Sequence, residues 1–271
     1  MTEPSRNGRS GAHAVGPQRG PAAGSVVPLG GSMSGGPLSG GSLSVGSLSG
    51  GRHARPATRP YYGGAEPRHG AFTILYVCTG NVCRSPIAER LTRHELSHRL
   101  GSSADDILVE SAGTWGHEGA PMESNAAEIL GEYGADPRGF VGRELLDEHV
   151  IGADLVLTAT LDHRAQVISM GHAAGLRTFT LKEFTRLVRA IDPATLPDTS
   201  DRPGDVAERA RVLVRAAAAL RGWLLAATPE ADEVDDPYGA PLGMFRNCGE
   251  EIFDALDPIV TALTGVARVS V

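Results

Sequence analysis

The chain has 271 residues, of which 21% are charged and 41% are hydrophobic, and its formal net charge at neutral pH is −7. This length is enough for one sizeable domain or two small ones. The negative charge argues against nucleic acid or an anionic membrane surface as the main partner.

Cysteine usage and hydropathy indicate the compartment. The three cysteines, at positions 78, 83 and 248, are too few for a disulfide framework. No N-terminal stretch combines basic residues with an apolar run, and the longest apolar runs fall short of the roughly 18 residues that span a bilayer. We therefore expect a cytoplasmic protein without membrane association, whose thiols stay reduced.

Residues 1–70 differ in composition from the rest of the chain. They are rich in Gly, Ser, Pro and Ala and contain an imperfect repeat over 38–51. Seven arginines and two glutamates give this segment a net charge of +5. Since the whole chain carries −7, residues 71–271 carry −12. Such a segment buries too little apolar area to offset its ordering entropy. We predict a flexible tail over 1–70, either a spacer or an interaction segment, and one folded domain over 71–271.

After residue 70, strand patterns alternate with helical patterns. The predicted strands are 72–77, 107–110, 154–158 and 176–181. The predicted helices are 86–100, 124–133, 162–172, one that ends near 190, 206–227, and a last one from about 245 that Pro258 kinks or splits. Residues 191–204 read as a loop because of their prolines and glycine. The alternation predicts an α/β fold with a parallel sheet covered by helices on both faces.

The segment from Cys78 to Ser85 is the main candidate site. It lies between the first predicted strand and the helix that starts near Pro86, where open α/β sheets bind ligands. Inward-facing amides and the positive end of a helix dipole stabilise an anion there. Cys78 is thus predicted to be a nucleophile that is ionised at neutral pH. Arg84 is predicted to bind two oxygens of a phosphate in a fork.

Other residues are predicted to support this loop. Gly80 and Asn81 tolerate the positive φ angles that such a loop needs. Ser85 can donate a hydrogen bond to the Cys78 sulfur, or simply start the helix. Cys83 can form a reversible disulfide with Cys78 or act as a small buried filler. Release of an alkoxide or aryloxide from phosphate requires an acid, and the run Asp235-Asp236-Pro237-Tyr238-Gly239 is the best candidate to supply it.

Three motifs carry a family resemblance. They are, in chain order, Ile74–Glu89, Glu110-Ser111-Ala112-Gly113-Thr114 and Asp236-Pro237-Tyr238-Gly239. In this order they resemble the markers of the low-molecular-weight protein tyrosine phosphatases. The resemblance covers about residues 71–265. It implies a three-layer α/β fold with a four-stranded parallel sheet in the flavodoxin-like, phosphotyrosine phosphatase I-like topology. It also implies hydrolysis of a phosphotyrosine protein or small aryl phosphate through a cysteinyl-phosphate intermediate, with no cofactor and no metal.

The resemblance also implies residue roles. Cys78 is the nucleophile, Arg84 binds phosphate, and Asp236 is the general acid and later the base for water. The phosphate-binding loop comprises Thr79, Gly80, Asn81, Val82, Cys83 and Ser85. Ser111 would hold Asn81, and Tyr238 would line the pocket.

The chain departs from the family pattern in several places. Thr160 aligns with an aspartate that braces the loop arginine in many members, and the nearest carboxylate is Asp162. Phe140 aligns with a histidine of some members. The loop after Thr114 is shorter, so that either Trp115 or His117 could line the pocket. About 30 additional residues separate the fourth strand from the acid segment.

Alternative functions are compatible with parts of the pattern. A thiol-linked arsenate reductase shares this loop but needs further cysteines, and only Cys248 lies outside the loop. A non-catalytic phospho-ligand binding module would explain Thr160 and Phe140 but has no use for a general acid at Asp236. A zinc site from Cys78, Cys83, His94 and His98 has loose spacing and is disfavoured. The physiological substrate and the oligomeric state do not follow from the sequence.

Overall fold

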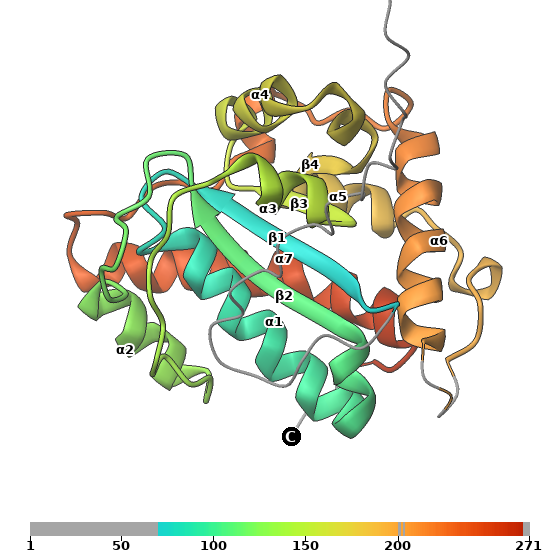
Figure 1. Cartoon of the computed structure of the whole chain (residues 1–271), viewed down its shortest axis with the longest axis horizontal. Helices are drawn as coiled ribbons and strands as arrows, with labels where there is room; N and C mark the ends of the chain where they lie inside the picture. Colours follow the sequence, from blue (N-terminus) through green and yellow to red (C-terminus); the bar gives the residue numbers. More distant parts are fainter. Residues whose placement is uncertain (1–69, 200–201, 203, 268–271) are drawn as a thin grey trace, which may run out of the picture. The chain divides into compact units, whose positions relative to one another are not determined.

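A four-stranded parallel sheet forms the centre of the computed structural model, which describes residues 70–199, 202 and 204–267. Apart from Gly70, the predicted tail lies outside the described residues. The strands are β1 (Phe72–Cys78), β2 (Ile107–Gly113), β3 (Leu155–Thr158) and β4 (Thr178–Thr180). Their order in the sheet is β2-β1-β3-β4 (Figure 1). The predicted α/β fold and its flavodoxin-like strand order are confirmed.

Helices cover both faces of the sheet. They are α1 (Arg84–Leu100), α2 (Ser124–Glu132), α3 (Asp147–Gly152), α4 (Leu161–Met170), α5 (Leu181–Val188), α6 (Asp205–Leu220) and α7 (Leu242–Thr264). The larger apolar cluster contains side chains of α1, α2, α5, α6 and α7, and the smaller one contains side chains of α3 and α4. Short 3₁₀ turns lie at Gly101–Asp106, His172–Arg177, Pro193–Thr195 and Pro229–Asp232. No helix in the described part of the chain is long and apolar enough to cross a bilayer.

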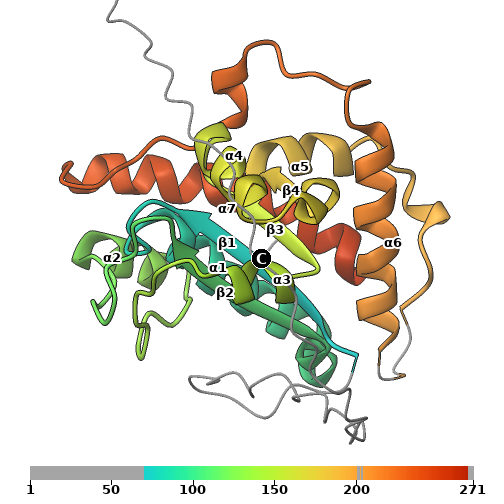
Figure 2. The same ribbon diagram turned by 45° about the horizontal axis from the view of Figure 1, so that its top comes forward.

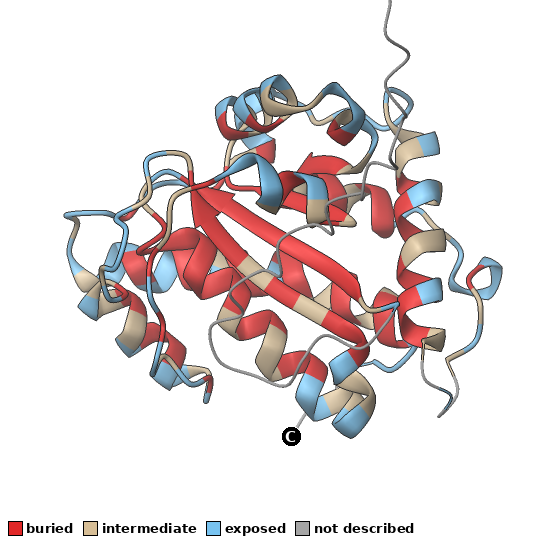
Figure 3. Ribbon diagram, in the orientation of Figure 1, coloured by how far each residue is buried: buried red, intermediate tan, exposed pale blue. Residues whose placement is uncertain are grey.

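Strand β1 has the burial expected of a central strand. All seven of its residues are buried (Figure 3). Successive side chains point to opposite faces, so Ile74 and Tyr76 enter the larger cluster while Leu75 and Val77 enter the smaller one. Because β1 is packed on both faces, its carboxyl end at Cys78 is held rigidly. The candidate loop therefore begins from a fixed point.

Helix α6 ends earlier than the sequence pattern predicts. The prediction of 206–227 is wrong at its C-terminus, because the helix ends at Leu220 and Gly222 has φ of +89°. Beyond it, Trp223 and Leu225 are exposed rather than packed. The helix contacts α5 and α7, and the segment that leaves it arches over the α4 and α5 side before it enters α7 (Figure 2).

Smaller differences concern the other elements. Strand β2 extends to Gly113, and β4 spans only Thr178–Thr180 because 172–177 forms a 3₁₀ turn. The short helix α3 was not predicted, since a six-residue helix shows too little periodicity.

Helix α7 continues through Pro258, so the predicted split is wrong. A proline inside a helix deprives the carbonyl four residues earlier of its donor. Here that carbonyl belongs to Asp254, and Arg189 Nη2 donates to it at 3.5 Å. The next carbonyl, of Ala255, accepts from the Thr185 hydroxyl at 2.8 Å. The Arg189 contact replaces the donor that the proline lacks, and the Thr185 contact adds a second link between α5 and α7.

A glycine is required where β2 ends beside the candidate loop. A Cβ atom on Gly113 would lie 2.3 Å from the Thr79 carbonyl oxygen and 2.9 Å from the Asn81 nitrogen. Both neighbours are backbone atoms, so neither can rotate away. We expect Gly113→Ala to lower the free energy of unfolding by about 2 kcal/mol or more, as measured by urea denaturation.

Gly131 provides the matched control for this substitution. It lies in α2, and a Cβ atom there would meet nothing within 4 Å. Gly131→Ala should stabilise the protein by about 0.5–1 kcal/mol, because alanine loses less entropy in a helix. Equal effects of the two substitutions would contradict the close approach at Gly113.

Candidate active site

Hydrogen bonds to its carbonyl groups hold the segment that follows β1 in place. The carbonyl oxygens of Cys78, Thr79, Gly80 and Val82 each accept a hydrogen bond of 2.9–3.0 Å from a backbone amide. The donors are the amides of Thr114, Trp115, His117 and Glu123, which all belong to the segment between β2 and α2. This segment therefore fixes four of the loop's peptide groups from one side.

The orientation of these carbonyls determines where the loop's N–H groups point. In a trans peptide the C=O and the following N–H point in opposite directions. The amides of Thr79, Gly80, Asn81 and Cys83 consequently face the interior of the loop. Helix α1 begins immediately afterwards at Arg84, and its unsatisfied N-terminal amides add positive potential on the same side. The loop is thus built to surround an anion.

Asn81 closes the loop on its inner side. Among the described non-glycine residues it alone has a positive φ, of 54°, and it is fully buried. Its Nδ2 donates to the hydroxyls of Ser85 and Ser111, both at 2.9 Å, and its Oδ1 accepts from the Arg143 amide at 2.9 Å. The Ser111 hydroxyl in turn donates to the buried carboxylate of Glu89 at 2.6 Å. The predicted contact between Ser111 and Asn81 is present.

The three cysteines differ in their surroundings. Cys78 Sγ lies 2.9 Å from Ser85 Oγ, as the sequence suggested. All three thiols are free and buried. Burial is the main cause that raises the pKa of Cys83 far above its ordinary value, and that raises the pKa of Cys248 to about 12. Cys83 and Cys248 are therefore neutral thiols at physiological pH.

The Arg84 guanidinium joins the loop to one distant segment, which contains Val234 and Asp236. Its Nη1 donates to the Val234 carbonyl at 3.1 Å, and its Nη2 donates to Thr79 Oγ1 at 3.2 Å and to Asp236 Oδ2 at 2.6 Å. The side chain is only 5% exposed. Its Nε is buried and has no hydrogen-bond partner among the described residues. A buried guanidinium with an unpaired N–H is suited to bind an oxyanion by donating a hydrogen bond to it.

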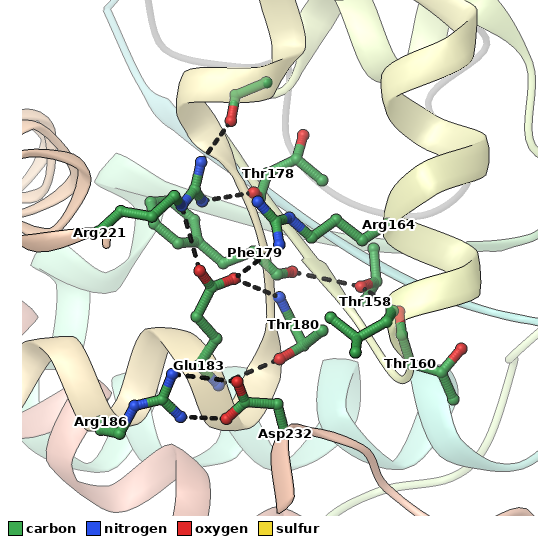
Figure 4. Close-up of polar contacts among 12 residues, drawn as sticks. Thr158, Thr160, Arg164, Thr178, Phe179, Thr180, Glu183, Arg186, Arg221 and Asp232 are labelled. Atoms are coloured by element: carbon green, nitrogen blue, oxygen red, sulfur yellow. Dashed lines mark hydrogen bonds and ion pairs between the residues drawn. The ribbon is translucent and has the colours of Figure 1, made fainter. Parts of the chain in front are cut away.

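The segment that carries Asp236 is attached to the end of β3 and to α5. The Val234 amide donates to the Ala159 carbonyl at 2.9 Å. Lys182 Nζ donates to the Glu233 carbonyl at 2.9 Å. Arg186 pairs with the nearly buried Asp232 through both carboxylate oxygens (Figure 4). These contacts place residues 232–236 beside the loop, although about 150 residues separate them in sequence.

Arg186 belongs to a larger polar cluster near β4. Figure 4 shows Glu183 between Arg221 and Arg164, with Thr180 below Phe179. Arg221 donates to Glu183 Oε1 at 3.1 Å, and its guanidinium carbon lies 3.9 Å from the centre of the Phe179 ring. Glu183 also completes a capping box with Thr180 at the start of α5. The helix that carries Arg186 is therefore fixed at its N-terminus.

Aromatic side chains lie at the mouth of the site. The His117 and Tyr238 rings meet edge to face with centroids 6.1 Å apart. A Cβ atom on Gly80 would lie 3.5 Å from His117 Nε2, so His117 lies against the loop. Trp115 is 72% exposed and Tyr238 is 61% exposed. Trp115 and His117 are the two residues that could line the pocket. Of these, His117 is thus the one that lies between the loop and the segment that carries Asp236.

The positions that depart from the family pattern have different partners. Thr160 caps α4 and contacts His163 Nδ1 at 2.6 Å, while Asp162 is exposed. His163 Nε2 lies 3.0 Å from the Thr79 hydroxyl. His163 was not singled out from the sequence, because a histidine three residues after a helix cap has no distinctive pattern. Phe140 is buried, and the Arg90 guanidinium carbon lies 5.7 Å from the centre of its ring. The nearby Arg143 amide donates to Asn81 Oδ1.

The alternative metal ligands do not converge. His94 and His98 lie side by side on α1, with tilted rings whose centroids are 4.3 Å apart. Among residues 70–199, 202 and 204–267, no group of three or more His, Cys, Asp or Glu side chains is arranged to hold a metal ion. The ligand types named in the sequence therefore do not form a cluster in the described part of the chain.

Comparisons with known proteins point to one family. The family model of the low molecular weight phosphotyrosine protein phosphatases matches residues 73–202. The low molecular weight protein-tyrosine-phosphatase Etp of Escherichia coli K12 is 34% identical over 121 residues, or 45% of this chain and 76% of that protein. A protein-arginine-phosphatase of Geobacillus stearothermophilus is 26% identical over 192 residues, which cover 71% of this chain and 96% of that protein.

The fold agrees with a solved member. The crystal structure of a low molecular weight protein tyrosine phosphatase from T. tengcongensis matches 70% of this chain and 98% of its own, with 29% identity and a TM-score of 0.50. With the loop, the strand order and these similarities together, the chain belongs to the low molecular weight phosphotyrosine protein phosphatase family.

Proposed function

We propose that this protein is a phosphomonoester hydrolase that dephosphorylates proteins, with phosphotyrosine as the preferred residue, through a cysteinyl-phosphate intermediate. The observation that carries the proposal is the contact between Arg84 and Asp236. It brings the candidate acid, 152 residues further along the chain, to the loop that contains Cys78. Nucleophile, oxyanion-binding groups and acid are thereby assembled in one site.

In the first step, the Cys78 sulfur attacks phosphorus. The S–P bond forms while the bond to the leaving oxygen breaks, and protonated Asp236 gives its proton to that oxygen. The loop amides and Arg84 bind the three equatorial oxygens, where negative charge is spread. In the second step, Asp236 removes a proton from water, water oxygen attacks phosphorus, and the thiolate leaves. The Ser85 hydroxyl, 2.9 Å from Sγ, stabilises the departing sulfur anion.

Substrate entry exchanges one anion for another at Arg84. Asp236 is 45% exposed and binds Nη2 at 2.6 Å, at a position suited to a phosphate oxygen. A phosphoryl dianion competes well for this guanidinium because it offers two oxygens to the fork. Once displaced from Arg84, Asp236 is free to reach the leaving oxygen, which needs a proton in the first step.

Two features bear on the choice of substrate. The aromatic rings of His117 and Tyr238 at the mouth of the site favour contact with a flat aryl group, which supports phosphotyrosine as the substrate. A second candidate is phosphoarginine, because the protein-arginine-phosphatase of Geobacillus stearothermophilus aligns along 96% of its length. Both substrates use the same nucleophile and the same oxyanion loop, so the leaving group and its surroundings decide between them.

The proposal predicts hydrolysis of p-nitrophenyl phosphate that depends on Cys78. We expect Cys78→Ser to lose at least about 10³-fold in kcat, because an unactivated hydroxyl is a poor nucleophile. Matched peptides with phosphotyrosine, phosphoarginine or phosphoserine should rank phosphotyrosine first in kcat/KM. A higher kcat/KM for phosphoarginine would favour the second candidate, and unchanged hydrolysis by Cys78→Ser would refute the mechanism.

A leaving-group series tests the acid. We expect Asp236→Asn to slow hydrolysis of alkyl and weakly acidic aryl esters by about 10²–10³-fold, and that of strongly activated aryl phosphates much less. The neighbouring Asp235→Asn serves as the matched control and should leave the series unchanged. Equal slowing of all substrates by Asp236→Asn would remove Asp236 from the role of general acid.

The anchor of the acid segment can be tested separately. Arg186→Ala leaves the carboxylate of Asp232, only 10% exposed, without its partner. We expect the free energy of unfolding to fall by about 1–3 kcal/mol, together with a lower kcat for poor leaving groups. The exposed pair Arg138–Asp136 supplies the control, since Arg138→Ala should change stability by less than about 0.5 kcal/mol. Similar losses in both variants would contradict the anchoring role.

A further inference from the structure

A buried histidine connects the active-site loop to the start of α4. His163 is 6% exposed, and both of its ring nitrogens are within hydrogen-bond distance of a hydroxyl. Nε2 lies 3.0 Å from Thr79 Oγ1, and Nδ1 lies 2.6 Å from Thr160 Oγ1. The same Thr79 hydroxyl accepts from Arg84 Nη2 at 3.2 Å. A continuous chain of hydrogen bonds thus runs from the guanidinium to the N-terminal cap of α4.

The imidazole in this chain is uncharged. Burial, followed by the nearby charge of Arg84, lowers the pKa of His163 to about 4, and the opposing effects of Asp236 and Asp162 are smaller. A neutral ring has one donor and one acceptor. Because Arg84 donates to the Thr79 oxygen, the Thr79 hydroxyl proton can be directed to Nε2. Nδ1–H then donates to Thr160, an order of donors that satisfies Arg84, Thr79 and His163 together.

We propose that His163 is a positioning residue that fixes the Arg84 guanidinium through the Thr79 hydroxyl. This inference rests on the proposed function and deepens it. When substrate displaces Asp236, two of the observed Arg84 contacts are left, namely the Val234 carbonyl and Thr79 Oγ1. The orientation of the fork toward phosphate then depends on how firmly the Thr79 hydroxyl is held, and His163 holds it.

A neutral partner suits this position. A protonated imidazole beside Arg84 would repel its guanidinium. The neutral His163 ring accepts from Thr79 and leaves the positive charge of Arg84 available to substrate. In this chain the residue acts from α4, while Thr160, at the preceding cap, orients the ring.

The test compares His163→Ala with His163→Gln, whose amide can reach Thr79 as Nε2 does. In steady-state kinetics with p-nitrophenyl phosphate, His163→Ala should raise the Ki of inorganic phosphate and lower kcat/KM by about tenfold each. His163→Gln should recover most of both. The exposed His172 supplies the control, and His172→Ala should behave as wild type. An unchanged phosphate Ki in His163→Ala would overturn the inference.

A double-mutant cycle tests the route through Thr79. In a Thr79→Val background, His163→Ala should add less than about twofold, because the hydroxyl that it positions is already absent. If His163→Ala keeps its full tenfold effect in that background, His163 does not act through Thr79. A merely structural role would lower the melting temperature and the active fraction while the phosphate Ki of the folded enzyme stayed the same, and that result also refutes positioning.

Failure of the proposed function gives a different result. If Cys78→Ser hydrolyses p-nitrophenyl phosphate like wild type, the proposed mechanism fails, and the inference fails with it. If Cys78→Ser is inactive while His163→Ala matches wild type in both kcat/KM and phosphate Ki, only the positioning role is refuted.

Discussion

The outward orientation of the carbonyl groups between Cys78 and Val82 is the constraint on which the site depends. Four backbone amides from the segment after β2 bind these carbonyls, and planar trans peptides then turn the loop's own N–H groups toward its interior. The close approach that this requires explains the glycine at the end of β2, where a Cβ atom would overlap the Thr79 carbonyl.

Arg84 links this loop to the rest of the site. It starts α1, so its backbone is fixed by the helix, while its guanidinium reaches the acid segment and the Thr79 hydroxyl. The ion pair with Asp236 satisfies the buried charge of Arg84, which would otherwise be costly. In the proposed mechanism, the same pair opens when phosphate binds. Ligand binding and positioning of the acid would then be coupled through one guanidinium.

The chain between β4 and Asp236 includes helices α5 and α6. Helix α6 packs on α5 and α7, away from the carboxyl ends of the strands that hold the loop. The chain then returns to the end of β3, where the Val234 amide binds the Ala159 carbonyl. An anchor on α5, through Arg186 and Asp232, holds the start of this return, four residues before Asp236.

Much of the fold and the local chemistry could be predicted from sequence alone. Alternating strand and helix patterns, with β1 as a mainly apolar run, indicated a parallel sheet, and the spacing of Cys78 and Arg84 indicated an oxyanion loop. These are local properties, set by side-chain periodicity and by residues that adopt unusual φ angles. The end of α6 and the continuity of α7 through Pro258 were mispredicted, because contacts with other elements override local propensity there.

The partners of Arg84 were decided by the tertiary structure. Nothing in the order of residues indicates that the Val234 carbonyl, Asp236 and the Thr79–His163 pair meet at one guanidinium, since they come from three separate segments. The sequence determined which groups are able to bind an oxyanion and to transfer a proton. Their distances and orientations depend on the packing of β3, α4 and α5 around the sheet, which only the folded chain establishes, because hydrogen bonds between distant segments carry no sequence periodicity.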